Sequence, residues 1–403
     1  MARHSNYWFS TTPGGIRIST GVPKEADIVI IGGGFSGISL LYHLVTAGYS
    51  NICVLEESGI SQHASGRGAG LLSLSSERDF ISLLSKYTTD DVNNYIKFIS
   101  LNNRFLKTII ANSRINCDLT NTGSFRIATT EEECGILHLN LPFIKRNEDA
   151  EFFSAEEIQS LMPISKKIKG GIFYPHDITF NPYKLLNELA DTIELVGKKI
   201  ITNASVTEVN NLDTGELEVV VKNRGIIRAR QVVYCINAYT NHLLPEFSKL
   251  LKAVKGFTVI SEENQNLTDI NYPIIIGGGN DCIRIVNNRV LYSSTSLDDV
   301  SIDYFDGYIP SSILSKMKTK LNKYFPDRKF ELSNIWSSLI AKPYDDMPFV
   351  GQIPDRNNEY VLSGFGRYSF NQIFLAAAMI RDYIKEGTTN LPAANLFTLK
   401  GRI

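Results

Sequence analysis

Residues 27–37 read Asp-Ile-Val-Ile-Ile-Gly-Gly-Gly-Phe-Ser-Gly, and this stretch decides the fold. Its first five residues predict a buried strand, and the glycines that follow have the spacing Gly-x-Gly-x-x-Gly. Gly32 permits a tight turn, and Gly34 lets the backbone approach a pyrophosphate. Gly37 lets the following helix pack closely on the strand. The stretch therefore predicts the start of a dinucleotide-binding βαβ unit.

The residues after the glycine turn complete that unit. Phe35 and Ser36 open a helix with one apolar face, and the strand Ile52–Leu55 follows it. The free N–H groups at such a helix N-terminus favour phosphate. Glu56 stands nineteen residues after Gly37, where dinucleotide-binding units place an acid on the ribose hydroxyls. We therefore predict an adenine dinucleotide site, the alternative being a glycine-rich turn in another α/β fold.

The composition is that of a globular chain with little net charge. Its 403 residues are 43% hydrophobic and 21% charged, which suits about two domains with a sizeable core. Because the net charge is −1, we expect neither nucleic acid nor a charged membrane surface as a partner. Five scattered cysteines without a Cys-x-x-Cys pair predict neither a disulfide framework nor a metal site.

The chain shows no targeting or membrane signal. Residues 1–10 lack the apolar segment of a secretory signal, and the longest apolar runs, such as 374–380, are too short to span a membrane. A reducing, cytoplasmic setting is the default for such a chain. The sequence does not indicate an oligomeric state.

Helical and strand-like spacings recur along the chain and predict two interleaved domains. Residues 1–25 read as an irregular arm, whereas 253–305 alternate like an antiparallel sheet with a turn at 277–281. The predicted fold is α/β, α+β overall, with a discontinuous Rossmann domain and an inserted mixed, largely antiparallel sheet domain. We assign residues 1–115, 170–250 and 330–403 to the first domain and residues 116–169 and 251–329 to the second.

Several short segments occur in an order typical of one group of flavoproteins. They are Tyr7-Trp8, Ala-Ser-Gly-Arg-Gly-Ala-Gly-Leu-Leu at 64–72, Thr-Gly-Ser-Phe-Arg-Ile-Ala at 122–128, Phe-Asn-Pro at 180–182, Asn-Ala-Tyr-Thr at 237–240, Leu-Leu-Pro at 243–245, and Trp336, Asp345, Pro348 and Gly351. Together they resemble the D-amino-acid-oxidase-like FAD-dependent oxidoreductases. The γ-glutamylputrescine-oxidase-like and sarcosine- or dimethylglycine-oxidising branches are the most similar.

The resemblance implies an FAD-binding domain of glutathione-reductase type with a substrate domain over the flavin. It also implies oxidation of the C–N bond of a small-molecule amine or amino acid. In that chemistry flavin N5 takes a hydride, the imine product hydrolyses, and O₂ or another acceptor reoxidises the flavin. Two alternatives stay open. One is an FAD dehydrogenase or biosynthetic tailoring oxidase with another acceptor, and the other is a catalytically silent flavoprotein subunit.

The resemblance extends the predicted cofactor site. Small residues in the loop 65–70 allow the backbone to approach the pyrophosphate and the flavin ring. The helix beginning near Asn371 is expected to direct its positive dipole end at the flavin. The predicted FAD-binding residues are Gly32, Gly34, Phe35, Ser36, Gly37, Glu56, His63, Ser65, Gly66, Arg67, Gly70, Leu71, Val206, Asn237, Ala238, Gly364, Arg367, Tyr368 and Ser369.

His63 raises the question of a covalent flavin. In the dimethylglycine-oxidising branch a Trp-His-Ala-Ala-Gly segment carries a flavin-linked histidine, and residues 63–66, His-Ala-Ser-Gly, are similar. Gln62 stands in place of the tryptophan, however. Ser338 aligns with the cysteine that links flavin in sarcosine-oxidising relatives. We predict non-covalent FAD, with a link through His63 as the alternative.

Four residues are candidates for the chemistry. Residues 364–371 read Gly-Phe-Gly-Arg-Tyr-Ser-Phe-Asn, where the family has a turn with further glycines and a histidine. Because a guanidinium keeps its charge and a rigid fork of donors, Arg367 is predicted to pair with an anionic substrate group or with reduced flavin, with Tyr368 beside it. Arg67 and Arg284 are candidates for a carboxylate contact. The alternatives are loop variation for the turn and solvated side chains for the other two arginines.

Overall fold

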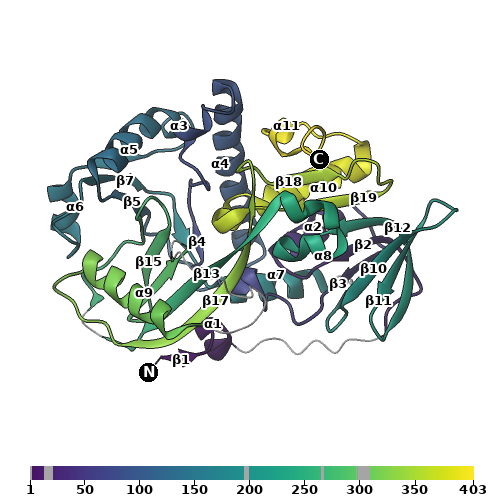
Figure 1. The fold of residues 1–403 in the computed structure, drawn as a ribbon, viewed down its shortest axis with the longest axis horizontal. Coiled ribbons are helices and arrows are strands. Elements are labelled where there is room, and N and C mark those ends of the chain that lie inside the picture. The colour runs from purple at the N-terminus through teal and green to yellow at the C-terminus, as the bar shows by residue number, and fades with distance from the viewer. Residues whose placement is uncertain (1, 13–20, 195–198, 265–266, 296, 298–308) are drawn as a thin grey trace.

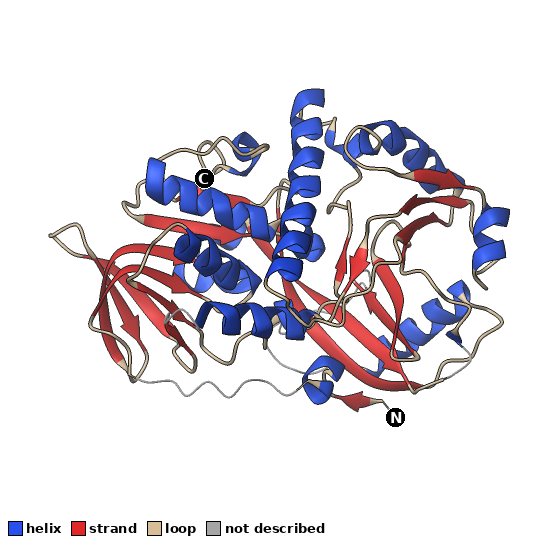
Figure 2. Ribbon diagram, turned by 180° about the vertical axis from the view of Figure 1, so that it is seen from behind, coloured by secondary structure: helices blue, strands red, loops and turns tan. Residues whose placement is uncertain are grey.

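Two sheets carry the fold, one of eight strands and one of nine. The computed structural model describes residues 2–12, 21–194, 199–264, 267–295, 297 and 309–403. The two sheets lie on opposite sides of the molecule in Figures 1 and 2, and long helices pack along the boundary between them. This arrangement confirms the predicted α/β class with a mixed second sheet.

The eight-stranded sheet contains the predicted βαβ unit. Strands β19, β12, β2, β3 and β9 are parallel neighbours, while β10 and β11 extend β12 as an antiparallel meander and β18 pairs antiparallel with β19. The glycine turn connects β2 to helix α2. The bounds are β2 (Glu25–Ile31), α2 (Phe35–Thr46), β3 (Ile52–Leu55), β9 (Lys199–Ile201), β10 (Val206–Asn211), β11 (Leu217–Val221), β12 (Gly225–Tyr234), β18 (Phe349–Gln352) and β19 (Glu359–Ser363).

Strand β2 is buried on both faces, which explains its unbroken apolar run. Ile28 and Ile30 pack into the core on the helix side, and Val29 and Ile31 pack into a second core beneath the β10–β12 meander. Helices α2, α4 (Thr89–Asn112), α7 (Pro182–Glu194) and α10 (Ile373–Glu386) supply the first of these cores.

The nine-stranded sheet has the order β1-β17-β13-β16-β15-β14-β5-β7-β6. Its β1–β17 and β14–β5 pairs are parallel and the other pairs are antiparallel. The bounds are β1 (Arg3–His4), β5 (Ser124–Ala128), β6 (Glu151–Phe153), β7 (Gly170–Tyr174), β13 (Leu251–Ser261), β14 (Ile274–Ile276), β15 (Asp281–Val286), β16 (Arg289–Ser294) and β17 (Leu332–Pro343).

Shorter elements complete the described chain. Strands β4 (Leu71–Leu72) and β8 (Ile178–Thr179) form a small pair. The remaining α-helices are α1 (Tyr7–Thr11), α3 (Phe80–Leu83), α5 (Glu131–Ile144), α6 (Ala155–Leu161), α8 (Thr240–Leu243), α9 (Ser311–Tyr324) and α11 (Ala394–Phe397). Described 3₁₀ helices are Ala64–Gly66, Asn237–Tyr239, Pro245–Lys249 and Gly366–Asn371.

The N-terminal arm differs from its prediction. Instead of an irregular segment, its described part forms β1, which pairs with β17, and helix α1. Residues 13–20 of the predicted arm lie outside the described residues. Tyr7 and Trp8 are buried, so tertiary packing gives this segment, in which Ser and Thr occupy four of residues 2–12, a regular structure that local composition does not predict.

The predicted domain boundaries stay a prediction. Strands β7 and β17 pair within the nine-stranded sheet, although their residues fall in the segments assigned to the dinucleotide domain. The antiparallel segment predicted for 253–305 is present in β13–β16, while 265–266, 296 and 298–305 lie outside the described residues.

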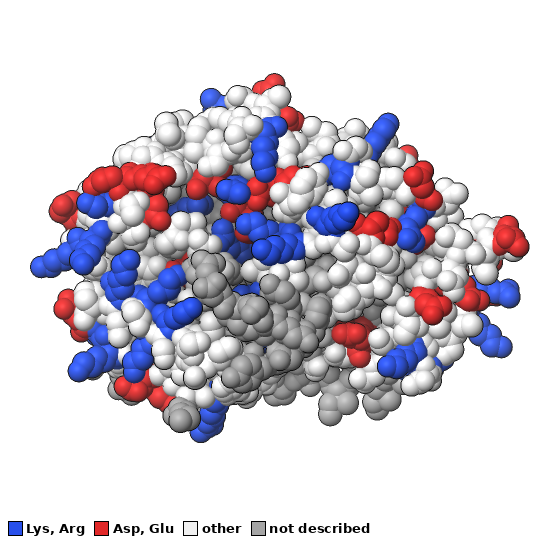
Figure 3. Space-filling view, viewed as in Figure 1, with Lys and Arg blue, Asp and Glu red and all other residues white. Residues whose placement is uncertain are grey.

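The apolar length of the helices and the distribution of surface charge are relevant to binding a membrane or a charged partner. No helix within the described ranges is both long enough and apolar enough to cross a membrane. In Figure 3 acidic and basic side chains are interspersed over the visible face.

Candidate active site

A cavity of about 440 Å³ lies where the two sheets meet. The glycine turn after β2 and residues at the end of β3 line one part of it, and one face of the nine-stranded sheet lines the other. The predicted cofactor residues that line it are Gly32, Gly34, Phe35, Ser36, Glu56, His63, Ser65, Arg67, Gly70, Leu71, Val206, Asn237, Arg367, Tyr368 and Ser369.

Gly32 and Gly37 leave no room for a side chain, and Gly34 leaves little. Gly32 has φ +109°, and a Cβ there would lie 2.5 Å from the carbonyl oxygen of Cys235. A Cβ on Gly37 would lie 1.9 Å from the Gly32 carbonyl oxygen, so this glycine brings α2 against the turn. A Cβ on Gly34 would lie 3.1 Å from Ser65 Oγ, within the cavity lining. The contacts of Gly32 and Gly37 agree with a tight turn and a closely packed helix, while the approach of Gly34 to a pyrophosphate stays a prediction.

Glu56 is buried at the end of β3 beside the turn. Its carboxylate accepts hydrogen bonds from the backbone N–H groups of Gly33 at 2.7 Å and Ser58 at 2.9 Å. Burial raises the pKa of Glu56, while these two N–H groups and the nearby His63 oppose the rise. The carboxylate is therefore fixed in the cavity wall next to the glycine turn.

His63 lies at this same end of the cavity. Its Nε2 is 3.0 Å from Ser58 Oγ, 3.5 Å from Glu57 Oε1 and 3.8 Å from Glu56 Oε1. The imidazole is partly exposed and packs edge-on against Tyr239. These contacts place His63 with the acids after β3.

The small-residue loop is held by three side chains from distant parts of the sequence. Asn6 Nδ2 donates to the Gly66 carbonyl oxygen at 3.1 Å, and Trp8 Nε1 donates to that of Gly68 at 3.1 Å. Trp336 Nε1 donates to the Arg67 carbonyl oxygen at 2.9 Å. The resemblance pointed to both tryptophans without a role for them, and the structure shows that they fix this loop along the cavity.

Arg67 and Arg284 differ in their access to the cavity. Arg67 lines it, while its Nε donates to the Gln62 carbonyl oxygen at 2.7 Å and its Nη1 to that of Ser337 at 3.1 Å. Arg284 does not line it: Nη2 donates to the Phe180 carbonyl oxygen at 2.7 Å, and the guanidinium lies over the Trp8 ring. Burial lowers the pKa of Arg284 to about 10.

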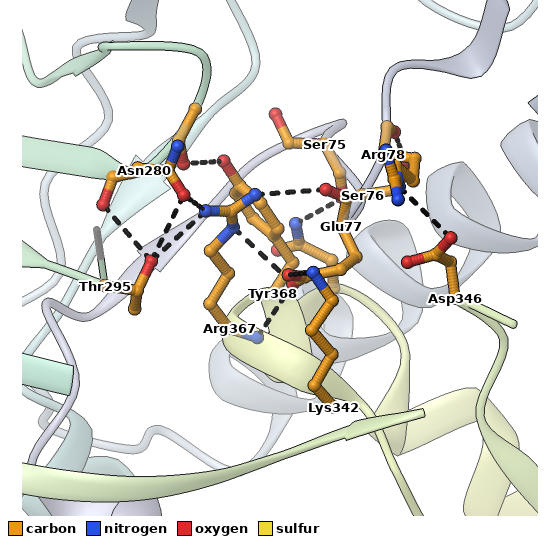
Figure 4. A network of polar contacts seen from close by, with 12 residues as sticks. Ser75, Ser76, Glu77, Arg78, Asn280, Thr295, Lys342, Asp346, Arg367 and Tyr368 are labelled. Carbon is orange, nitrogen blue, oxygen red and sulfur yellow. Dashed lines mark hydrogen bonds and ion pairs between the residues drawn. The ribbon is translucent and has the colours of Figure 1, made fainter. Parts of the chain in front are cut away.

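Arg367 lines the cavity within a polar network, which Figure 4 shows. Its Nη1 donates to Asn280 Oδ1 and, at 3.1 Å, to Thr295 Oγ1. Nη2 donates to the Glu77 carbonyl oxygen at 3.0 Å, and Nε lies 3.5 Å from Glu77 Oε2. The side chain therefore joins the 3₁₀ helix Gly366–Asn371 to the loop after β4 and to the nine-stranded sheet.

Two further residues extend this network. Tyr368 Oη donates to the Gly279 carbonyl oxygen at 2.7 Å, and burial raises its pKa. Lys342 Nζ lies 3.5 Å from Glu77 Oε1 (Figure 4). Sequence reasoning found the turn at 277–281 but missed Glu77, Asn280 and Thr295, because nothing local marks them as partners of Arg367.

Residues that alternate along the strands form the sheet side of the cavity. Ile274, Ile283 and Tyr292 pack into a core with helix α9. Their neighbours Ile275, Cys282 and Ser293 point to the other face and line the cavity. Gly256 of β13 and Ser338 and Ile340 of β17 belong to the same wall. The alternation of side chains between the two faces of each strand is the sequence signal from which these residues could have been predicted.

Five predicted site residues lie outside the cavity lining, namely Gly37, Gly66, Ala238, Gly364 and Arg284. A Cβ on Gly66 would lie 2.0 Å from the Ser61 carbonyl oxygen, and one on Gly364 would lie 2.9 Å from Leu251 Cδ2. Ala238 is buried in the core beneath the meander. The glycines therefore permit close packing of the backbone around the site, and direct cofactor contact by these residues stays a prediction.

The start of α10 also meets the cavity. Ile373, its first residue, and Phe370 just before it line the wall. The first turn of α10 contains no acidic residue, so no side chain there opposes the positive end of the helix dipole. An anionic group in the adjacent cavity would be stabilised by this end of the helix.

Comparison with known proteins decides the family. The sequence model of the family described as "FAD dependent oxidoreductase" (DAO) matches residues 27–383. This chain belongs to the FAD dependent oxidoreductase family. A similar relative is the gamma-glutamylputrescine oxidoreductase of Escherichia coli K12, 25% identical over 380 residues that cover 92% of this chain and 86% of that protein.

Solved structures of two other oxidoreductases share the fold. The glycine oxidase of Geobacillus kaustophilus superimposes with a TM-score of 0.79 at 20% identity, covering 94% of this chain and all of the other. The L-proline dehydrogenase of P. horikoshii superimposes with a TM-score of 0.80 at 19% identity, covering 92% and 96%.

The family is FAD-dependent, and the site fits this cofactor. The glycine turn, the buried Glu56 carboxylate and Ser65 line one cavity, and the turn allows the close backbone approach that a dinucleotide requires. This chain is accordingly an FAD-dependent oxidoreductase.

Proposed function

We propose that this enzyme oxidises the C–N bond of a small amine or amino acid to an imine and passes the electrons to O₂. The observation that carries the proposal is one cavity shared by the dinucleotide turn and by the face of a second sheet. A cofactor held at the turn and a substrate held against the sheet would meet within this one cavity. The names of the similar proteins, an oxidoreductase of a polyamine derivative and enzymes of two amino acids, support this substrate class.

In this proposal the chain's own residues bind and orient. Gly34, Ser65 and Glu56 hold the dinucleotide, and the loop pinned by Trp8 and Trp336 lies along it. FAD supplies the hydride acceptor when bound. The polar sheet face orients the carbon to be oxidised. The surrounding walls, with Ile275 and Phe370, exclude water from it.

The substrate nitrogen must be uncharged before a hydride leaves the neighbouring carbon. An amine in solution at neutral pH is mostly protonated, since its pKa resembles that of lysine. In the cavity, burial against Ile275 and Ile340 and the positive charge of Arg367 both disfavour the ammonium form. The site would therefore select the neutral amine without a dedicated general base.

The deciding experiment is anaerobic titration of the purified flavoprotein with a panel of amines and amino acids. Under the proposal at least one of them bleaches the flavin absorbance, and admitting air restores it. Bleaching without reoxidation in air would indicate a dehydrogenase with another acceptor. If dithionite bleaches the flavin and no amine does, the chain is better described as a silent flavoprotein subunit.

A further inference from the structure

Glu77 lies next to Arg367 but outside the cavity lining of the described residues. One oxygen of its carboxylate accepts a hydrogen bond from the Arg367 backbone N–H at 3.3 Å, and the Glu77 carbonyl oxygen accepts one from Arg367 Nη2 at 3.0 Å. Only 11% of the Glu77 side chain is exposed. Glu77 therefore holds both the backbone and the guanidinium of Arg367.

Gly366 leaves the space in which this carboxylate lies. Its φ is +59°, a conformation that glycine adopts without strain, and a Cβ there would lie 2.6 Å from Glu77 Oε2. Arg367 follows directly and continues into the cavity wall. The turn that carries Arg367 and the loop that carries Glu77 are therefore fitted to each other.

Two cations share the Glu77 carboxylate, as Figure 4 shows. Oε2 lies 3.5 Å from Arg367 Nε, and Oε1 lies 3.5 Å from Lys342 Nζ. Since a guanidinium is always charged, two positive groups face one carboxylate and one positive charge is left over. Of the three side chains only Arg367 lines the cavity. The excess charge is thus presented to the cavity through Arg367.

Neighbouring charges do not cancel this excess. Asp79 pairs with Arg126, and Asp346 pairs with Arg78 and Lys86. Arg78 and Lys86 are about half exposed, so solvent screens their charge. Within the described ranges, no second carboxylate lies within 4 Å of either cation of the Glu77 group.

A positive charge in this wall bears on the bound cofactor. When a flavin accepts two electrons and one proton, its ring gains one negative charge, and protein charges near the ring tune that step. Because the Arg367 side chain is only 15% exposed, its field is screened less than that of a surface cation. The N-terminal end of α10, which meets the cavity at Ile373, adds a positive dipole end.

We infer that Glu77 and Lys342 are positioning residues that act through Arg367 and set the reduction potential of the bound FAD. Glu77 fixes the guanidinium in the cavity wall. Lys342 takes part of the Glu77 charge and so leaves the positive charge that favours reduced flavin. The inference concerns the cofactor alone and does not depend on the proposed amine oxidation, so either can fail without the other.

A series of charge variants tests the inference. Glu77→Gln keeps the length of the side chain and an oxygen acceptor for the Arg367 N–H but removes the negative charge. Lys342→Met removes the cation that shares the carboxylate. The potential of the FAD-loaded protein is measured by anaerobic reductive titration against a reference dye, so the readout does not depend on turnover. We expect opposite shifts: at a fixed solution potential, the ratio of reduced to oxidised flavin rises at least about threefold in Glu77→Gln and falls at least about threefold in Lys342→Met. Each change corresponds to about 14 mV for a two-electron couple.

Two further variants separate charge from structural damage. The double variant Glu77→Gln with Lys342→Met restores the net charge, so its potential should return toward wild type, whereas damage to the site would add up. Lys318→Met is the matched control, since Lys318 is also a half-exposed lysine near a carboxylate, Glu331 at 4.0 Å, but lies on α9 away from the cavity. It should leave the potential unchanged. Shifts of the same sign in the two single variants, or no shift in Lys342→Met beyond that of Lys318→Met, overturn the inference. If Glu77→Gln does not retain FAD, Lys342→Met against its control decides alone.

Discussion

Replacing Gly37 with alanine tests whether the first turn of α2 must lie directly on the glycine turn. A Cβ at this position would lie 1.9 Å from the Gly32 carbonyl oxygen, whereas ordinary contacts begin at 3.4 Å. Because the clashing Gly32 oxygen belongs to the backbone, no side-chain rotation relieves the clash, and α2 must move outward by about 1.5 Å. Overpacking of this kind typically costs 1–3 kcal/mol.

The same displacement moves the end of α2 at the glycine turn, where we propose that the FAD phosphates bind. We therefore expect Gly37→Ala to lower the free energy of unfolding by about 1–3 kcal/mol and to weaken FAD binding at least about tenfold, or about 1.4 kcal/mol. Urea unfolding of the apoprotein measures the first quantity. Quenching of flavin fluorescence on titration with apoprotein measures the second.

Gly135 offers a matched control. It lies exposed within α5, and a Cβ there would meet nothing within 4 Å. Because alanine is favoured over glycine inside a helix by about 1 kcal/mol, Gly135→Ala should be neutral or stabilising and leave FAD affinity unchanged. The reasoning is refuted if Gly37→Ala unfolds within about 0.5 kcal/mol of wild type and binds FAD within about twofold.

Three further outcomes are expected. Acid precipitation should release FAD into the supernatant, and flavin found on the peptide carrying His63 by mass spectrometry would contradict this. Burial raises the pKa of Asp177 from its ordinary value of 3.8 to about 7. Between about pH 4 and pH 7 the carboxyl of Asp177 therefore stays protonated in the native protein but ionises in the unfolded chain, so the free energy of unfolding falls by up to about 4 kcal/mol over this range. Asp177→Asn should remove this part of the pH dependence of urea unfolding. An unchanged pH profile in the variant would refute this role of Asp177. Arg367→Ala should slow anaerobic flavin reduction about tenfold. Arg367→Lys should restore little of the rate, since a single ammonium does not replace the guanidinium that donates to both Asn280 and Glu77. A reduction rate of Arg367→Ala within about twofold of wild type would show that Arg367 does not contribute to the reaction.

The dinucleotide unit could be read from sequence because its determinants are local. The strand, the turn and helix α2 lie within Glu25–Thr46, and β3 follows at once. Steric needs of the turn select glycine at 32 and 37, and burial on both faces of β2 selects an apolar run. Glu56 follows β3 directly, so its place beside the turn is determined by the parallel pairing of β2 and β3.

The arginines could not be placed in this way. Arg284 shares a strand face with Cys282, yet only Cys282 lines the cavity, because Trp8 of the N-terminal segment covers Arg284. Likewise, the orientation of Arg367 depends on Glu77, 290 positions away, and on Asn280 in the turn between β14 and β15. Local sequence contains no information on such partners.

The sequence by itself thus determined the glycine turn and the dinucleotide unit, since short-range sterics and hydrophobic period specify them. The family and FAD followed from the resemblance of the short ordered segments to those of one group of flavoproteins. Tertiary structure decided which face of the second sheet meets the cavity and which charges remain available there. Those properties arise from packing between segments far apart in the chain. Desolvation and pairing of a charge depend on every neighbour in space, so the charge of the substrate pocket emerges only once the chain is folded.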